Sequence, residues 1–136
     1  MKIKLDSGAY MPTRAHEADA GLDLYSREEV LLRGGDSYCF DTGVHMAIPA
    51  GYVGFVKSKS GLNVRHNIQS EGVIDSGYTG SIVVNLVNHS IWPVQIEKGQ
   101  KISQIVLLPI ITPELELVDA LEATERGNGG FGSTGK

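Results

Sequence analysis

Short apolar runs rich in β-branched residues, each ended within a few positions by Gly, Pro, Asn or Asp, make up most of this 136-residue chain. Runs of this kind are typical of strands, and helical periodicity is almost absent. One short helical turn is expected at residues 60–64, where Ser60 could act as the N-cap. Strands are predicted at residues 2–5, 21–25, 30–32, 37–47, 52–57, 72–74, 81–88, 94–97, 101–109 and 115–117.

Ten short strands joined by short loops indicate an all-β protein, either a barrel or a two-sheet jelly roll. The run at 82–87 is apolar apart from Asn85, which is typical of a central strand covered on both faces. Residues 75–80 lie between two apolar runs and predict a wide hairpin turn. The composition changes only near Thr124, so we expect a β-barrel domain over residues 1–124 and a C-terminal tail over residues 125–136.

The tail is unusually rich in glycine: residues 127–136 hold five glycines, two hydroxyl residues and Phe131. Because glycine loses the most backbone entropy on ordering, we expect this tail to be flexible by itself. Its backbone N–H groups could wrap an anion and Phe131 offers a flat surface, which suits a lid over a ligand with phosphates and a planar ring. A plain linker is the alternative. Two phosphate-loop patterns fit the tail, but the strand and helix that those motifs need are missing.

The formal charge of −4 argues against a nucleic-acid polymer as partner, because such proteins usually present a basic stripe. The single Cys39 excludes an intrachain disulfide and fits a reducing compartment. Since Cys39 lies in an apolar run, it is expected to be a small buried residue. No signal peptide or membrane span is expected. These features favour the cytoplasm, or a virion or host cytoplasm if a phage encodes the chain.

Three polar islands interrupt the strand pattern. Asp23 lies inside a strand-like segment and is either functional or a solvent-facing acid on a half-buried strand. Lys59, Ser60 and Gly61 follow a strand and could cradle a phosphate, although lysines and serines are common on surface loops. Gln104 lies within an apolar strand, where a buried amide needs a partner or a ligand.

A fourth island, residues 71–80, places Asp75 directly after an apolar pair and three residues before Tyr78. Apolar neighbours would orient and partly desolvate the carboxylate, and an ionised Asp can accept a proton from water. Tyr78 adds a flat face and a hydroxyl group. A plain Asx-type turn is the alternative.

Together with the tail, these islands resemble the homotrimeric dUTPase family, the dUTP diphosphatases. The resemblance spans residues 18–135. It rests on five motifs in order, namely Ala20-Gly21-Leu22-Asp23-Leu24, Lys59-Ser60-Gly61-Leu62, Gly72-Val73-Ile74-Asp75 with Tyr78 and Gly80, Gly99-Gln100-Lys101-Ile102-Ser103-Gln104, and the segment from Arg126 to Gly135.

The resemblance implies a jelly-roll β-barrel of the β-clip type that assembles as a homotrimer. The active sites would lie at subunit interfaces, with the tail of one chain closing over a pocket built by the others. It also implies hydrolysis of dUTP to dUMP and pyrophosphate, with Mg²⁺ bound to the triphosphate. Such a reaction keeps uracil out of DNA and supplies dUMP for dTTP synthesis.

Residue roles follow from the same resemblance. Asp75 would activate the attacking water, and Gln104 would lie near the α-phosphate and that water. Asp23 would support either the magnesium ion, indirectly through water, or the phosphate end of the substrate. Tyr78 would lie against deoxyribose and leave no room for a 2′-hydroxyl. The remaining substrate-binding residues would be Lys59, Ser60 and Gly61 at the phosphates, Gln69, Gly72, Val73, Ile74 and Val83 at the uracil edge, and Arg126, Phe131, Gly132, Ser133 and Thr134 in the tail.

The sequence departs from the family pattern at Lys59 and Lys101, where Arg is commoner, and at Ser103, where Ala is commoner. A lysine replaces the bidentate fork of an arginine by a point charge. Two alternatives are a dCTP deaminase-like nucleotide enzyme, which shares the fold, and a non-catalytic jelly-roll binding or regulatory module. The presence of Asp75, Tyr78 and the tail favours a dUTPase over both.

Overall fold

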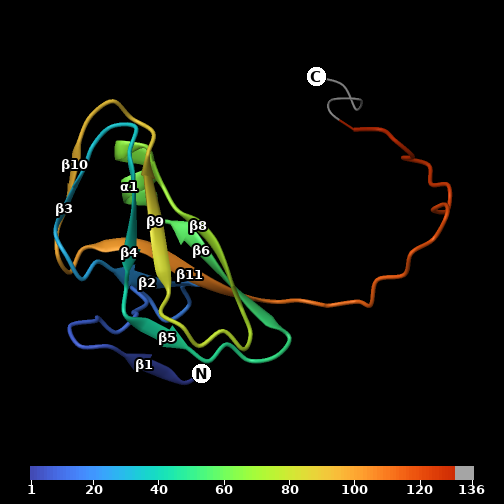
Figure 1. Cartoon of the computed structure of the whole chain (residues 1–136), viewed down its shortest axis with the longest axis horizontal. Coiled ribbons are helices and arrows are strands. Elements are labelled where there is room, and N and C mark those ends of the chain that lie inside the picture. Colours follow the sequence, from blue (N-terminus) through green and yellow to red (C-terminus); the bar gives the residue numbers. More distant parts are fainter. Residues whose placement is uncertain (131–136) are drawn as a thin grey trace.

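The computed structural model describes residues 1–130, in which the regular secondary structure is almost entirely antiparallel strands (Figure 1). The largest sheet has four strands, and its order in space differs from its order along the chain. From edge to edge the strands are β2 (Gly21–Tyr25), β11 (Lys101–Pro109), β6 (Tyr52–Ser58) and β8 (Glu71–Asp75).

The second sheet has three strands, and two further strand pairs complete the body. The three-stranded sheet runs β4 (Ser37–Asp41), β9 (Val83–Asn88) and β7 (Ile68–Gln69). The two pairs are β1 (Ile3–Leu5) with β5 (Val44–Met46), and β3 (Val30–Leu32) with β10 (Val94–Ile96).

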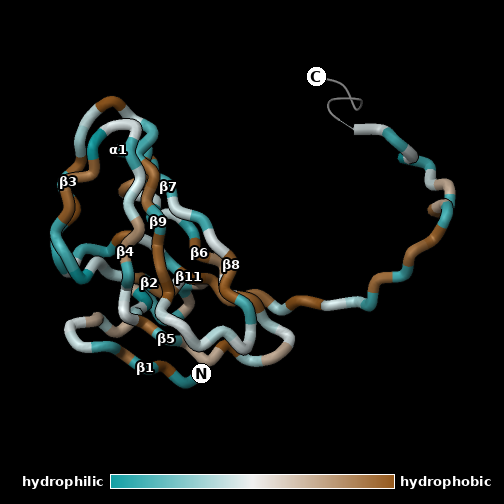
Figure 2. The backbone as a smooth tube through the Cα atoms, viewed as in Figure 1, coloured by the Kyte–Doolittle hydropathy of each residue, from teal (hydrophilic) through white to brown (hydrophobic). Residues whose placement is uncertain are grey.

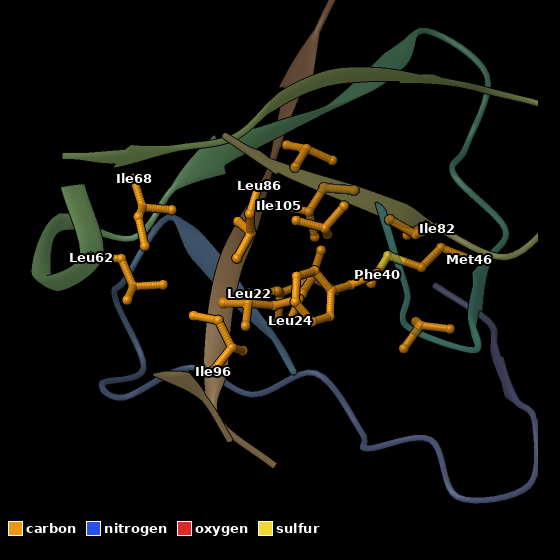
Figure 3. Close-up of a cluster of buried hydrophobic side chains, with 14 of the residues drawn as sticks. Leu22, Leu24, Phe40, Met46, Leu62, Ile68, Ile82, Leu86, Ile96 and Ile105 are labelled. Atoms are coloured by element: carbon orange, nitrogen blue, oxygen red, sulfur yellow. The ribbon is translucent and has the colours of Figure 1, made fainter. Parts of the chain in front are cut away.

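A single hydrophobic core joins all of these sheets (Figure 3). Leu24 and Ile105 enter it from the four-stranded sheet, and Phe40 enters it from β4; all three are 0% exposed. These positions alternate with outward-facing residues, because successive side chains of a strand point to opposite faces. Burial of one face therefore selects the register of each strand.

The predicted strand at 37–47 is two strands, β4 and β5, interrupted at Thr42 and Gly43. Gly43 has a φ of 65°, a left-handed conformation that favours glycine and turns the chain. The buried Thr42 hydroxyl donates to the Ile82 carbonyl oxygen at 2.6 Å, which ties this corner to the start of β9. The two-residue strand β7 was not predicted, because it is too short to show a periodicity.

The prediction that residues 75–80 form a hairpin turn is wrong. β8 pairs with β6 in the four-stranded sheet, whereas β9 lies between β4 and β7 in the other sheet. Residues 76–82 therefore cross from one sheet to the other. The local sequence shows only that the chain turns, and the partner of each strand is chosen by distant segments.

In the single chain, one face of β9 is exposed to solvent. The prediction that this strand is covered on both faces is therefore wrong. Val84 and Leu86 are buried, whereas Val83 is 49% exposed and Asn85 is also exposed. Cys39 pairs with Asn85 on this outer face and its thiol lies 3.6 Å from the Asn85 amide oxygen. The prediction that Cys39 is buried is wrong for the same reason, because Phe40 takes the inward position of β4.

The helix α1 (Ser60–His66) is longer than predicted and has a different cap. Lys59, not Ser60, is the N-cap residue, and no side chain donates or accepts a capping hydrogen bond there. Leu62 anchors the helix in the core. Among residues 1–130, no helix has the length and apolar character needed to cross a bilayer.

Beyond Pro109 the described chain leaves the body as an extended segment (Figure 1). The strand predicted at 115–117 is absent, because no other segment within residues 1–130 lies beside it to form a ladder. Hydrophobic residues nevertheless continue along it (Figure 2), and Ile111, Leu115 and Leu117 are 89%, 96% and 101% exposed. Exposed apolar stretches of this kind are typical of interaction surfaces.

Replacing Leu24 by Ala tests the core. Leu24 is fully buried, so we expect a loss of about 2–5 kcal/mol in the free energy of unfolding, from lost transfer energy and the cavity left behind. Leu31→Ala is the matched control: Leu31 is 54% exposed and should cost less than about 1 kcal/mol. Urea titrations followed by fluorescence would measure both. Equal losses for the two variants would contradict this assignment of the core.

Candidate functional site

Asp23 is a buried acid held between two lysines. It lies in the middle of β2 and is 3% exposed, which rules out the solvent-facing alternative. Lys59 Nζ lies 2.6 Å from its Oδ1 atom, and Lys101 Nζ lies 2.7 Å from its Oδ2 atom. Lys59 comes from the loop before α1, and Lys101 from the start of β11, where a register shift turns the strand. One carboxylate therefore organises cations from two distant segments.

The electrostatics of this cluster favour the charged states of Asp23 and Lys101. Burial by itself raises the pKa of Asp23, but the hydrogen bonds and charges of Lys101 and Lys59 outweigh it and lower that pKa overall. In return, the Asp23 carboxylate raises the pKa of Lys101. Because two cations face one anion, the cluster carries a net positive charge.

This arrangement does not fit Asp23 as a support for Mg²⁺. Both carboxylate oxygens already accept from ammonium groups, which would also repel a divalent cation. Elsewhere in residues 1–130, no group of three His, Cys, Asp or Glu side chains could hold a metal ion. A magnesium ion at this site would depend on ligands from a bound phosphate chain.

Gln104 lies next to this cluster because β11 pairs with β2 at Gln104 and Asp23. Its amide nitrogen donates to the Ser58 carbonyl oxygen at 3.1 Å. Its amide oxygen occupies the space beside Gly21, where an added Cβ atom would lie 2.1 Å away. Gly21 is therefore required for the Gln104 side chain to lie in this place.

Two adjoining cavities share Lys59. The first measures about 350 Å³ and is lined by Asp19, Gly21, Asp23, Lys59 and Gln104 among others. The second measures about 260 Å³, and Gly61, Arg65, His66 and Lys101 also line it. Basic side chains outnumber acidic ones here, in spite of the acidic composition of the chain. The predicted phosphate loop thus lies where an anion would be attracted.

Asp75 and Tyr78 form a second group at the end of β8. The Tyr78 backbone N–H donates to the Asp75 carbonyl oxygen at 3.2 Å, and the Tyr78 hydroxyl donates to the Ser81 carbonyl oxygen at 3.0 Å. The Tyr78 ring folds back over Gly80, where an added Cβ atom would lie 2.3 Å from the hydroxyl oxygen. Tyr78 is 46% exposed, and Asp75 is also exposed. The turn therefore presents a carboxylate and a ring face together to solvent.

The facing edges of β8 and β9 carry backbone groups without ladder partners. β8 is an edge strand that pairs only with β6, and β7 covers only the Val87 and Asn88 end of β9. Alternate residues of an edge strand turn their backbone N–H and C=O groups away from the ladder, so β8 around Val73 and Ile74 and β9 at Val83 offer groups, within residues 1–130, that could bind a planar group by its edge. Gln69 lies on β7 beside a cavity of about 550 Å³, whose lining includes Ser70, Glu71, Asn85, Val87 and His89.

The two groups are too far apart to act together in one chain. Gln104 pairs with Lys57 of β6, whereas Asp75 pairs with Val53, four residues away along the same strand. This offset corresponds to roughly 13 Å along the strand, and two strand spacings between β11 and β8 add about 10 Å across the sheet. Asp75 and Gln104 of one chain therefore cannot contact the same reacting atom.

The remaining predicted residues lie in or near the tail. Arg126 is exposed, and its Nε atom donates to the Gly129 carbonyl oxygen at 3.0 Å. Phe131, Gly132, Ser133 and Thr134 lie outside the described residues.

Lys101 is the site residue that the sequence did not reveal, because it was noted there only as a departure from the family pattern. Its pairing with Asp23 depends on the register of β11, which the sequence does not show.

The Asp23 cluster predicts how stability depends on pH. The pKa of Asp23 is lowered in the folded state, so its contribution is complete above its ordinary value of 3.8 and is lost as the pH falls through the folded value. We expect Asp23→Asn to cost roughly 3 kcal/mol at neutral pH, because two half-buried cations lose their partner. We also expect the difference from wild type to shrink in acid. Thermal unfolding between pH 2.5 and 7 would measure it.

The exposed pair of Lys57 and Glu71 supplies the control for that experiment, because Glu71→Gln removes a carboxylate whose side chain is 77% exposed. Exposed pairs contribute about 0–1 kcal/mol. A similar loss of stability in both variants would contradict a special role for the buried cluster.

Comparison with known proteins identifies the family. The dUTPase family profile matches residues 8–135. The deoxyuridine 5′-triphosphate nucleotidohydrolase of Clostridium acetobutylicum is 42% identical over 139 residues, covering 99% of this chain and 96% of the relative. That of Cutibacterium acnes is 46% identical over 129 residues, covering 92% and 85%.

Solved structures agree with these relatives. The Staphylococcus bacteriophage 80alpha dUTPase with dUpNHpp has a TM-score of 0.93 at 34% identity, covering 99% of this chain and 98% of that one. A variant dUTPase from phage phi11 of S. aureus, which coordinates a structural Mg(II) ion, has a TM-score of 0.83 at 32% identity, covering 90% and 98%. The jelly-roll prediction is thereby confirmed, and the chain belongs to the dUTPase family.

Proposed function

We propose that this protein hydrolyses dUTP to dUMP and pyrophosphate. The observation that carries the proposal is the exposed turn that holds Asp75 and the Tyr78 ring together, next to strand edges with open backbone groups. Family membership and the named activity of the relatives support the same reaction.

The separation of the two groups within one chain supports a site shared between subunits. A water molecule oriented by both Asp75 and Gln104 requires these residues from different chains, because their strands place them far apart in one chain. The exposed apolar residues beyond Pro109 supply a surface for such an assembly. We therefore propose a homotrimer in which the Asp75 turn of one subunit faces the Lys59 loop of another.

In this site Asp75 is the general base. It takes a proton from a water molecule whose oxygen attacks the α-phosphorus, the bond to the bridging oxygen breaks, and pyrophosphate leaves. Lys59, Ser60 and Gly61 bind the phosphates, and Gln104 orients the α-phosphate and the water. The substrate is the magnesium complex of dUTP, in which the metal offsets phosphate charge. Positioning and charge stabilisation supply most of the rate for such a reaction.

Of the two roles that the family resemblance implies for Asp23, support of the phosphate end fits the lysine pairs better than support of the metal. Because both of its oxygens accept from lysines, we propose that Asp23 positions Lys59 and Lys101 for phosphate binding. A lysine has a flexible stem and a single point charge, so it needs such an anchor more than an arginine fork does. This compensates for the departure from the commoner Arg at both positions.

Base and sugar recognition would use the open strand edges. The backbone groups of Gly72, Val73, Ile74 and Val83, with the Gln69 amide, would read the uracil edge. Cytosine presents a donor where uracil has an acceptor, so it would leave buried backbone groups unpaired. The Tyr78 ring would lie against deoxyribose and exclude a ribose 2′-hydroxyl.

The C-terminal segment would close the site. We propose that residues 1–124 form the barrel domain, and residues 125–136 form a lid on an active site of the trimer. Arg126, Ser133 and Thr134 would bind the γ-phosphate, Gly132 would bring backbone close to it, and Phe131 would stack on uracil. The single Cys39 is compatible with a reducing cytoplasm as the place of action.

Asp75→Asn tests the base assignment. The amide keeps the shape of the side chain but cannot accept the proton, so we expect turnover to fall by at least about 10²-fold while dUTP still binds. Pyrophosphate release would measure turnover, and calorimetry with a non-hydrolysable dUTP analogue would measure binding. Near-normal hydrolysis by this variant would refute the assignment of Asp75 as the base.

The same assay on wild type, run with dUTP and the four standard deoxynucleotides, tests the function itself. Selective pyrophosphate release from dUTP is expected. Ammonia release from dCTP would identify a deaminase, and no reaction with any nucleotide would identify a non-catalytic module.

Deletion from Gly127 onward tests the lid. Base stacking on an aromatic ring is worth about 1–3 kcal/mol, so we expect kcat/KM for dUTP to fall roughly 5- to 150-fold from the loss of Phe131 alone. Light scattering should show an unchanged trimer. Phe131→Tyr is the control, because it keeps the stacking surface. Full activity of the shortened chain would show that the tail is only a linker.

A further inference from the structure

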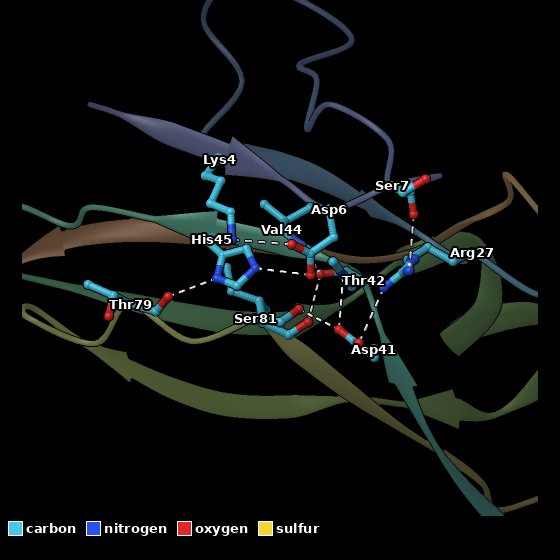
Figure 4. Close-up of polar contacts among 12 residues, drawn as sticks. Lys4, Asp6, Ser7, Arg27, Asp41, Thr42, Val44, His45, Thr79 and Ser81 are labelled. Atoms are coloured by element: carbon cyan, nitrogen blue, oxygen red, sulfur yellow. Dashed lines mark hydrogen bonds and ion pairs between the residues drawn. The ribbon is translucent and has the colours of Figure 1, made fainter.

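His45 connects the N-terminal strand pair to the turn that bears Asp75 and Tyr78 (Figure 4). Its Nδ1 atom lies 2.8 Å from the carbonyl oxygen of Thr79, the residue after Tyr78. The side chain is 18% exposed, so this hydrogen bond is largely shielded from water. β5 pairs with β1, so the backbone that carries the imidazole is held in a hydrogen-bonded ladder.

The other ring nitrogen faces an acid. Nε2 lies 3.1 Å from Asp6 Oδ2, an ion-pair distance, but within residues 1–130 this buried nitrogen makes no hydrogen bond of good geometry. Asp6 is held in turn by its backbone N–H, which donates to the Gly43 carbonyl oxygen at 2.9 Å. A protonated ring donates toward both acceptors, whereas a neutral ring with its proton on Nδ1 turns a lone pair toward the carboxylate. The surroundings therefore favour the imidazolium form.

The next residues of the turn are anchored to the same corner of the fold. The Ser81 hydroxyl donates to Asp41, which also accepts from the Gly43 backbone N–H at 3.0 Å and from Arg27 at 3.2 Å. The Tyr78 hydroxyl donates to the Ser81 carbonyl oxygen. Tyr78 is thus fixed at both ends. Its backbone adjoins the anchored residue Thr79, and its hydroxyl is bound to the anchored residue Ser81.

We propose that His45 is a positioning residue for the nucleotide site. By holding the Thr79 carbonyl group, it fixes the Tyr78 ring against the sugar and keeps the turn that carries Asp75 in place. This inference rests on the proposed function and adds to it a residue outside the five family motifs.

The protonation state of His45 gives this role a pH dependence. The Thr79 carbonyl group and then Asp6 raise the pKa of His45, against smaller opposing effects of burial and of Lys4. A second lysine, Lys2, lines the same small cavity as Lys4 and His45. The anchoring by both ring nitrogens is therefore complete below the ordinary value of 6.5. It weakens as the pH rises through the raised value, because a neutral ring can donate to only one of the two acceptors.

The ratio of kcat/KM for dUTP to kcat/KM for UTP, measured from pH 5.5 to 9, tests this proposal. Both substrates share the base, the metal and the phosphate chain, so ionisation of those groups cancels in the ratio. In wild type we expect the ratio to fall about three- to tenfold across the pKa of His45, as one hydrogen-bonded contact weakens. A ratio independent of pH would overturn the proposal.

Three variants separate positioning from general stability. His45→Asn can still donate from the Nδ1 position but does not titrate, so its ratio should stay near the low-pH value at every pH. His45→Leu should give a low ratio at every pH. Asp6→Asn keeps the imidazole but removes its carboxylate partner, so the midpoint should move to lower pH. A wild-type profile in His45→Leu or in Asp6→Asn would overturn the proposal.

A readout that does not need activity distinguishes this inference from the proposed function. In wild type, the NMR signal of the Gly80 amide should shift with pH at the midpoint of the His45 ring protons, and it should not shift in His45→Asn. If wild type hydrolyses no dUTP, the proposed function fails, and this titration still decides whether His45 controls the turn. A Gly80 signal that ignores the ring titration would overturn the proposal.

Discussion

Strand β11 lies between β2 and β6, and its hydrogen-bond register decides which residues of this protein can share a site. The row that contains Gln104 also contains Asp23 and Lys57, so the residues proposed to bind phosphate gather at one end of the sheet. Asp75 lies at the other end, opposite Val53. The backbone ladder thus divides the chemistry into two groups, and only assembly of several chains can bring them together.

The buried charge of Asp23 is the second feature on which the site depends. A carboxylate that is 3% exposed is stable only with partners, and here the partners are the two cations that a phosphate would also attract. The ion pairs that satisfy Asp23 also hold Lys59 and Lys101 in fixed positions. Under the proposed function, phosphate binding there would require little reordering of flexible side chains, which favours affinity.

The turn between β8 and β9 is held by residues far away in the sequence. Thr79, Ser81 and Ile82 are each bound by a side chain from residues 41–45. Turns that cross between sheets have no ladder of their own, so such side-chain contacts determine their shape. The positions of Asp75 and of the Tyr78 ring therefore depend on the corner around Gly43 as much as on their own motif.

The sequence by itself determined the strand content, the family and the residue types of the site, because alternation, turn residues and five short motifs are local properties of the chain. It could not determine that Lys101 pairs with the buried Asp23 or that Cys39 is exposed. Nor could it determine that residues 115–117 form no strand or that residues 76–82 cross from one sheet to the other. Those features depend on which strands pair and in which register, and the free energy of pairing comes from contacts between distant segments. Only the tertiary structure decided them.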